Sequence, residues 1–183
     1  MRIVGGKYKR RQLAAPKGPA TRPTSDRTRE SLFNILEQKL PGGFNGISVI
    51  DLFAGTGALG LEAISRAASQ AVFVDNAKPA LDCINQNISS LGEEVSTKVL
   101  KRDATRLGLL PANIQPVQLA FLDPPYGKAL AVPALMSLRE NEWLRDDALC
   151  VVEIGKKETL DPPPGLTISD ERRYGAAKIL VLA

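Results

Sequence analysis

The sequence predicts an α/β domain with a mostly parallel sheet of seven strands, helices on both faces and an antiparallel hairpin at the carboxyl end. Three observations predict it. Between residues 48 and 154, short apolar runs typical of buried strands alternate with segments of helical periodicity. A glycine-rich loop joins the first of these strands to a helix. Residues 166–182 contain two further strand-like runs that turn at Tyr174-Gly175.

The elements follow from local signals along the chain. Ser25 or Asp26 can cap a first helix, which Pro41-Gly42-Gly43 ends. Its apolar stripe is Leu32, Phe33, Leu36 and Leu40. We expect strands over residues 48–53, 71–75, 95–100, 117–122, 148–154, 166–171 and 177–182, and helices near 58–68, 78–91 and 130–139. Because ligands of parallel sheets bind beyond the carboxyl ends of the strands, we expect the site there.

Composition excludes several classes of function. The 183 residues contain no histidine, which removes serine and cysteine triads, paired-histidine zinc sites and any imidazole base. The two cysteines, Cys83 and Cys150, lie in apolar stretches without metal-ligand spacing, so we expect buried free thiols and no metal. No apolar run is long enough to span a membrane and no secretory signal is evident. We therefore expect a cytosolic (cytoplasmic) protein. We also expect a monomer, although the sequence carries no direct signal of oligomeric state.

Positive charge is concentrated at the amino end. Residues 1–29 hold nine Lys or Arg and one acid, whereas residues 30–183 hold 15 Lys or Arg and 19 Asp or Glu. Basic segments of this kind usually bind polyanions, although a merely solvated tail would have the same composition. The sequence is rich in glycine and proline up to residue 24, with short strands expected near residues 2–4 and 12–14. We predict a nucleic-acid-binding arm over 1–24 and a catalytic domain over 25–183.

The glycine loop, Gly55-Thr56-Gly57-Ala58-Leu59-Gly60, matches the dinucleotide-binding pattern, and Asp75 follows at the expected spacing. A nicotinamide or flavin dinucleotide is therefore one candidate cofactor, and a purely structural turn is another interpretation. Asp51, at the end of the preceding strand, favours a third interpretation, in which the cofactor is S-adenosylmethionine. Its negative charge would oppose a pyrophosphate but would suit the methionine ammonium of S-adenosylmethionine. Asp75 suits ribose hydroxyls in both cofactors, and Asp103 fits either an adenine contact or a turn cap.

The most specific motif is Asp123-Pro124-Pro125-Tyr126, which follows the fourth strand. Two prolines fix two φ angles and donate no hydrogen bond, so the loop is stiff. The Asp123 carboxylate and the Pro124 carbonyl can accept hydrogen bonds from a planar amino group and stabilise the positive charge that develops when its nitrogen is methylated. Tyr126 can stack on a base that has been flipped out or unpaired. A plain Asp-Pro turn is the alternative interpretation.

Taken together, these motifs resemble a class I amino-methyltransferase with a Rossmann-like fold. The resemblance rests on residues 49–63 (VIDLFAGTGALGLEA) and 123–126 (DPPY). The amino end, with 2–8 (RIVGGKY), 22–27 (RPTSDR) and 29–34 (RESLFN), is similar to the bacterial small-subunit (16S) ribosomal RNA guanine-N2 methyltransferase family. Arg10 departs from this pattern, because relatives often carry glycine there. The match is strong in these segments and vague over 127–183.

The resemblance implies S-adenosylmethionine as cofactor and ribosomal RNA, or an assembly intermediate of the small ribosomal subunit, as partner. It implies a cofactor site lined by Asp51, Phe53, Ala54, Gly55, Gly57, Asp75, Asn76, Asp103 and Ala104. It assigns the target guanine to Asp123, Pro124, Pro125 and Tyr126. It assigns RNA contacts to Lys7, Lys9, Arg10, Arg11, Arg22, Arg27 and Arg29.

Three other functions remain open from the residues. The proline loop would serve any planar amino nitrogen, including adenine N6 in DNA or a protein glutamine amide. The glycine loop alone is compatible with a nicotinamide oxidoreductase. A basic arm on an α/β body would also suit a non-catalytic RNA-binding assembly factor.

Overall fold

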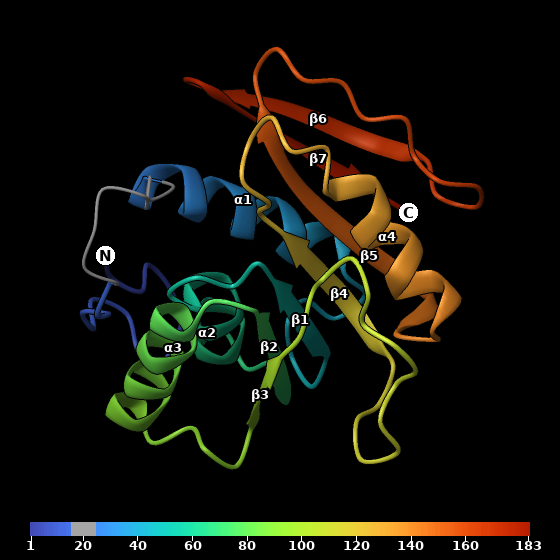
Figure 1. Ribbon diagram of the computed structural model, residues 1–183. Coiled ribbons are helices and arrows are strands. Elements are labelled where there is room, and N and C mark those ends of the chain that lie inside the picture. Colours follow the sequence, from blue (N-terminus) through green and yellow to red (C-terminus); the bar gives the residue numbers. More distant parts are fainter. Residues whose placement is uncertain (16–24) are drawn as a thin grey trace.

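A single sheet of seven strands organises the chain in the computed structural model, which describes residues 1–15 and 25–183 (Figure 1). The strands are β1 Ser48–Leu52, β2 Gln70–Asp75, β3 Thr97–Lys101, β4 Val117–Leu122, β5 Leu144–Gly155, β6 Ile168–Tyr174 and β7 Ala177–Leu182. Their order in space is β3-β2-β1-β4-β5-β7-β6. The first five are parallel, and β7 pairs antiparallel with both β5 and β6. The predicted sheet and its closing hairpin are confirmed.

Four helices cover the two faces of the sheet: α1 Asp26–Lys39, α2 Ala58–Ser65, α3 Lys78–Leu91 and α4 Ala131–Glu140. Strand residues alternate between two cores, as the pleat requires. Val49, Phe73 and Phe121 pack with α1, α2 and α3, whereas Ile50 and Leu122 pack with α4 on the opposite face. The predicted helices on both faces are therefore confirmed. None of the helices in the described part of the chain is long and apolar enough to cross a membrane.

Local signals set most element boundaries correctly. The Ser25 side chain accepts a hydrogen bond from the Thr28 N–H and caps α1, and Gly92 ends α3 in the left-handed conformation. Four elements differ clearly from expectation: α2 ends at Ser65 rather than near residue 68, β6 spans Ile168–Tyr174 rather than residues 166–171, and β3 and β5 begin elsewhere. Strand β3 begins at Thr97 because Val95 lies in a turn with its side chain 97% exposed. Strand β5 begins at Leu144, and its pairing with β4 is irregular near its start. Its first residues include Arg145, Asp146 and Asp147, and these charged side chains do not form the apolar run by which a buried strand is recognised.

Residues 1–15 are folded onto the body of the domain. Arg2 and Gln12 form an antiparallel bridge, in line with the two short strands expected there. The Val4 N–H donates to the buried carboxylate of Glu62 at 2.8 Å, and the Lys7 N–H donates to the Ser65 carbonyl at 2.8 Å. Because these partners lie on α2, the amino-terminal turn is anchored directly behind the glycine loop.

Arg10 occupies a tight turn in this segment and has a φ of 75°. Its N–H donates to the Ile3 carbonyl at 2.8 Å, which holds the turn closed. Left-handed backbone costs a residue with a Cβ roughly 1–2 kcal/mol, whereas glycine adopts it freely. The backbone therefore explains why the family resemblance places glycine at this position.

We predict that Arg10→Gly is more stable than Lys9→Gly by about 1–2 kcal/mol in the free energy of unfolding, because only the first substitution relieves left-handed backbone. Both variants lose one exposed basic side chain and gain the same chain entropy, and Lys9 does not have a positive φ. Urea unfolding of the two variants measures the difference. Equal stabilities would show that the turn is not strained.

Candidate active site

Three acids converge at the carboxyl edge of the sheet, where the chain order reverses between β1 and β4. Leu52 on β1 pairs with Val74 on β2 and with Leu122 on β4. Asp75 and Asp123 each follow one of these partners, so both lie beside the end of β1. Both also act electrostatically on Asp51, which lies one residue before Leu52. This is the switch point at which parallel sheets bind ligands.

Asp51 is the most deeply buried of these acids. Its carboxylate is 3% exposed and accepts a hydrogen bond from the Gly60 N–H at 2.9 Å. Burial raises its pKa to about 8 against the opposing effect of that hydrogen bond, and the charges of Asp123 and Asp75 raise it further. No ion pair to Asp51 exists among the described residues. A cationic group at this edge would favour the ionised carboxylate.

The three glycines of the loop are required for different structural reasons. Gly55 has a φ of 56°, and a Cβ built on it would meet only the Phe53 carbonyl oxygen, at 3.9 Å, so its ligand-facing side is open. Gly57 is the left-handed N-cap of α2. A Cβ on Gly60 would lie 2.4 Å from the Phe73 ring, so this glycine lets α2 pack closely on the sheet. The literal dinucleotide pattern thus contains one glycine that leaves room for a ligand.

The backbone before the glycine loop is also unusual. Phe53 has a φ of 57°, which is strained for a residue with a Cβ and costs on the order of 1–3 kcal/mol. Its half-exposed ring follows β1 directly, and Ala54 is buried behind it. Strain of this kind is characteristic of ligand-binding loops. The cofactor contact expected for Phe53 and Ala54 stays a prediction.

Asp75 holds the loop from β2. One carboxylate oxygen accepts from the Gly55 N–H at 3.0 Å, and the other accepts from the Ala77 N–H at 2.9 Å. Neighbouring Asn76 is exposed at the same edge.

Asp103 forms the turn cap that was one of its two interpretations, because its Oδ1 accepts hydrogen bonds from the Thr105 N–H and hydroxyl at 2.8 and 2.7 Å. Those hydrogen bonds lower its pKa, and Ala104 is buried beside it.

A second acid, which sequence reasoning missed, lies beside the proline loop. Glu153, on β5, lies next to Asp123 because Leu122 and Val152 are paired in register. Burial raises the pKa of Asp123 to about 7, and the charge of Glu153 adds to this shift. The Glu153 carboxylate accepts a hydrogen bond from the Tyr126 hydroxyl at 2.6 Å. The signal that could have identified it is an acid within the otherwise apolar run over residues 148–154, close to the end of that strand.

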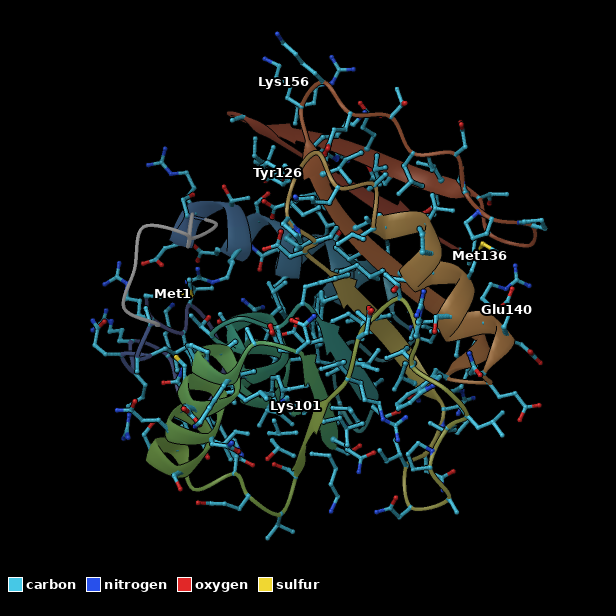
Figure 2. The ribbon with its side chains drawn as sticks, in the orientation of Figure 1. Met1, Lys101, Tyr126, Met136, Glu140 and Lys156 are labelled. Carbon is cyan, nitrogen blue, oxygen red and sulfur yellow. The ribbon has the colours of Figure 1, made fainter. Side chains whose placement is uncertain are left out.

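The loop itself is rigid and partly open. Pro124 is buried, whereas Pro125 and Tyr126 are exposed, and Figure 2 shows the Tyr126 side chain at the carboxyl end of the sheet. Glu158, in the loop after β5, accepts hydrogen bonds from the Gly127 and Gly155 N–H groups. The four proposed catalytic residues, 123–126, therefore form one stiff segment beside Asp51, which we call the proline corner.

Of the seven basic residues predicted to contact RNA, Lys9, Arg10 and Arg27 are exposed and without an ion pair in the described ranges. The others are engaged to different degrees. Lys7 pairs with Glu93 at 2.5 Å, and its pKa is raised by that contact. Arg11 donates to the Ser90 carbonyl at 2.7 Å. Arg22 lies outside the described residues.

Arg29 corrects the prediction made for it. Its side chain is 2% exposed and donates to the Arg2 carbonyl at 2.6 Å and to the Asp26 carboxylate at 2.7 Å. A guanidinium buried in this way cannot reach an RNA phosphate in this conformation. Arg29 instead fastens the amino end of the chain to the first turn of α1, a role that its basic surroundings in the sequence concealed.

No group of three or more His, Cys, Asp or Glu in residues 1–15 and 25–183 is placed to hold a metal ion. Cys83 and Cys150 are buried free thiols, as expected. Burial raises the pKa of the Cys150 thiol to about 12. The side chains and backbone groups that the described residues bring to this edge include carboxylates, peptide groups and the Tyr126 phenol.

Comparison with known proteins supports this description. The family model described as conserved hypothetical protein 95 matches residues 1–183 of this chain. Ribosomal RNA small subunit methyltransferase D of Escherichia coli (strain K12) is 35% identical over 153 residues, which cover 84% of this chain and 74% of that protein. The Haemophilus influenzae protein of the same name is 32% identical over 176 residues, covering 96% and 89%.

Solved structures agree over nearly the whole length. The yhhF structure from Escherichia coli superposes with a TM-score of 0.82 at 31% identity, covering all of this chain and 96% of that one. HI0767 from Haemophilus influenzae superposes with a TM-score of 0.80 at 30% identity, covering 99% and 96%. These likenesses confirm the Rossmann-like methyltransferase fold that the sequence motifs predicted.

We predict that Asp51 makes the folded protein less stable as pH rises between about 4 and 8. Its folded pKa of about 8 lies above the ordinary value of 3.8, so the folded state keeps a proton that the unfolded chain loses in this window. Each pH unit should cost roughly 1.4 kcal/mol from this group, up to its folded pKa. Asp51→Asn should remove that slope.

Urea unfolding from pH 5 to pH 8.5 checks this prediction, with the exposed Asp161→Asn as control for loss of a carboxylate. The stability of Asp51→Asn relative to wild type should rise with pH, whereas that of the control should stay flat. A constant difference between Asp51→Asn and wild type would mean that Asp51 is already ionised in the folded protein.

Proposed function

Because this chain belongs to the family of ribosomal RNA small subunit methyltransferase D and its homologues, we propose that it transfers a methyl group from S-adenosylmethionine to the exocyclic N2 amine of a guanine in 16S ribosomal RNA. The observation that supports the proposal best is the position of Asp123 and its proline corner directly beside Asp51 and the glycine loop. A methyl donor on the loop and an amino group on the corner would then be neighbours.

The residues of the glycine loop fit S-adenosylmethionine in charge and space. The buried Asp51 carboxylate would pair with the methionine ammonium, and the open side of Gly55 would admit the backbone of the ligand. Asp75 retains acceptor capacity on both oxygens for ribose hydroxyls, since a carboxylate offers about four lone-pair sites. Asp103 would contact the adenine through Oδ2. When bound, the cofactor supplies an electrophilic methyl group on a sulfonium.

The proline corner would hold the acceptor nitrogen. An aromatic amine is a weak nucleophile because its lone pair is delocalised, so orientation and charge stabilisation carry the reaction. The Asp123 carboxylate and the Pro124 carbonyl accept its two N–H groups, and Tyr126 stacks on the base. As the nitrogen gains a carbon it becomes positive, and the acceptors stabilise that charge before a proton leaves. The pKa of Asp123, about 7, makes it a suitable proton acceptor near neutral pH.

A nucleic acid is favoured over a protein glutamine by the exposed basic residues of the amino end, Lys9, Arg10 and Arg27. A polyanion would meet these charges, whereas a protein glutamine would not require them. The family relationship favours ribosomal RNA over DNA. DNA adenine N6 has the same amino chemistry and remains the alternative that product analysis must separate. We propose a cytoplasmic monomer that acts on ribosomal RNA or on an assembling small subunit.

The test is methyl transfer from tritiated S-adenosylmethionine to small subunits and 16S RNA from cells that lack this gene. Wild type should yield N2-methylguanosine, and Asp123→Ala should lower kcat on the order of 10²-fold or more, since it removes a preorganised acceptor. Binding of S-adenosylmethionine, measured by calorimetry, should survive in the variant. Methylated adenine or glutamine, or equal activity in both proteins, would refute the assignment.

A second prediction concerns Glu153 as a positioning residue. Glu153→Gln removes a negative charge beside Asp123, so the pKa of Asp123 should fall. If the ionised Asp123 is the active form, the acidic limb of the kcat–pH profile should move to lower pH, while the KM for S-adenosylmethionine stays constant. Tyr126→Phe removes the hydrogen bond to Glu153 and keeps the charge, so it is the matched control. An unshifted limb in Glu153→Gln would exclude this role.

A further inference from the structure

Two loops beside the candidate active site carry three exposed lysines, Lys128, Lys156 and Lys157, which we call the lysine rim. One carboxylate holds the loops together. Glu158 accepts the Gly127 N–H on Oε1 and the Gly155 N–H on Oε2, the latter at 2.6 Å. Because both N–H groups reach one carboxylate, the two backbones lie side by side. Lys128 and Lys156 each follow one of these glycines directly.

The second loop is a tight turn. The Glu158 N–H donates to the Gly155 carbonyl at 2.9 Å, so Lys156 and Lys157 are its two central residues. The Lys156 N–H donates to the Ala176 carbonyl at 2.9 Å, which anchors the turn to the β6–β7 hairpin. Figure 2 shows Lys156 on the same end of the molecule as Tyr126, beyond the proline corner. Backbone hydrogen bonds therefore hold Lys156 and Lys157 in place beside the proline corner.

The lysines of the rim form no ion pair among the described residues. None of the three lysines has an acidic partner within 4.0 Å among the described residues, whereas Lys39, Lys78 and Lys178 on the same body are all ion-paired. Residues 30–183 carry more acids than bases, so a basic cluster here contrasts with the surrounding composition. Positive charge around a site raises the local concentration of anionic substrates.

We propose that the lysine rim binds RNA phosphates that flank the target nucleotide. This inference rests on the proposed function, because it requires a nucleotide in the site. A base seated against Asp123 would leave its sugar and phosphates outside the proline corner, where the rim lies. Lysine is a flexible point charge that suits phosphates without reading sequence, so the rim would fix the strand while the corner holds the base.

The test compares two double variants that each lose two exposed lysines without an ion pair among the described residues: Lys156→Gln/Lys157→Gln in the rim, and Lys98→Gln/Lys101→Gln on β3. Binding to 16S RNA is measured against salt concentration. Loss of two phosphate contacts on a single strand should reduce the log–log slope by about 1.4. The rim variant should also raise the KM for RNA, with kcat at saturating RNA and S-adenosylmethionine affinity unchanged. The control variant should match wild type.

Equal salt slopes in the rim variant and in wild type would overturn the rim proposal and leave methyl transfer intact. A rim variant that matches the control in both slope and KM would do the same. Failure of the wild type itself to methylate RNA would overturn the proposed function, and the rim proposal with it. Lys128→Gln, tested alone, should reduce the slope by about 0.7, so the third lysine is examined without disturbing the turn.

Discussion

The parallel pairing of β1 with β2 and β4 is the constraint on which the whole site depends. It brings the carboxyl ends of three strands to one edge, and with them Asp51, Asp75 and Asp123. Burial raises the pKa values of Asp51 and Asp123. Neighbouring negative charge raises both pKa values further, from Asp123 and Asp75 in the case of Asp51 and from Glu153 in the case of Asp123. Such an edge is unfavourable when empty and therefore suited to ligands that bring positive charge or hydrogen-bond donors.

The amino-terminal segment is connected to this edge of the sheet through a residue of α3. Asn87, on α3, is buried and accepts the Ala14 N–H at 2.7 Å, while its amide donates to the Ala14 carbonyl and, at 2.9 Å, to the Thr56 carbonyl in the glycine loop. One side chain thus binds both the basic segment and the glycine loop. The basic residues consequently divide between structural anchors, such as Arg29, and exposed groups, such as Lys9.

The absence of histidine is consistent with this arrangement. Methylation of an aromatic amine needs oriented acceptors more than a strong base, and the proline corner offers a carboxylate and a carbonyl on a stiff backbone. Glu153 adds charge beside Asp123 and fixes the Tyr126 hydroxyl at 2.6 Å. Glu158 accepts hydrogen bonds from the backbone on both sides, so it connects the proline corner to the loop after β5, which carries part of the lysine rim.

The sequence by itself determined the order of the elements, the sheet class, the glycine loop and the proline corner, because periodicity and glycine or proline punctuation are local properties. It also located Asp51, Asp75 and Asp123, since each ends or follows an apolar strand. Only the tertiary structure decided that Arg29 is buried, that Glu153 adjoins Asp123 and that Glu158 joins two loops. Those facts depend on the packing of α1 and on the register of β4 with β5, which no local pattern of residues specifies.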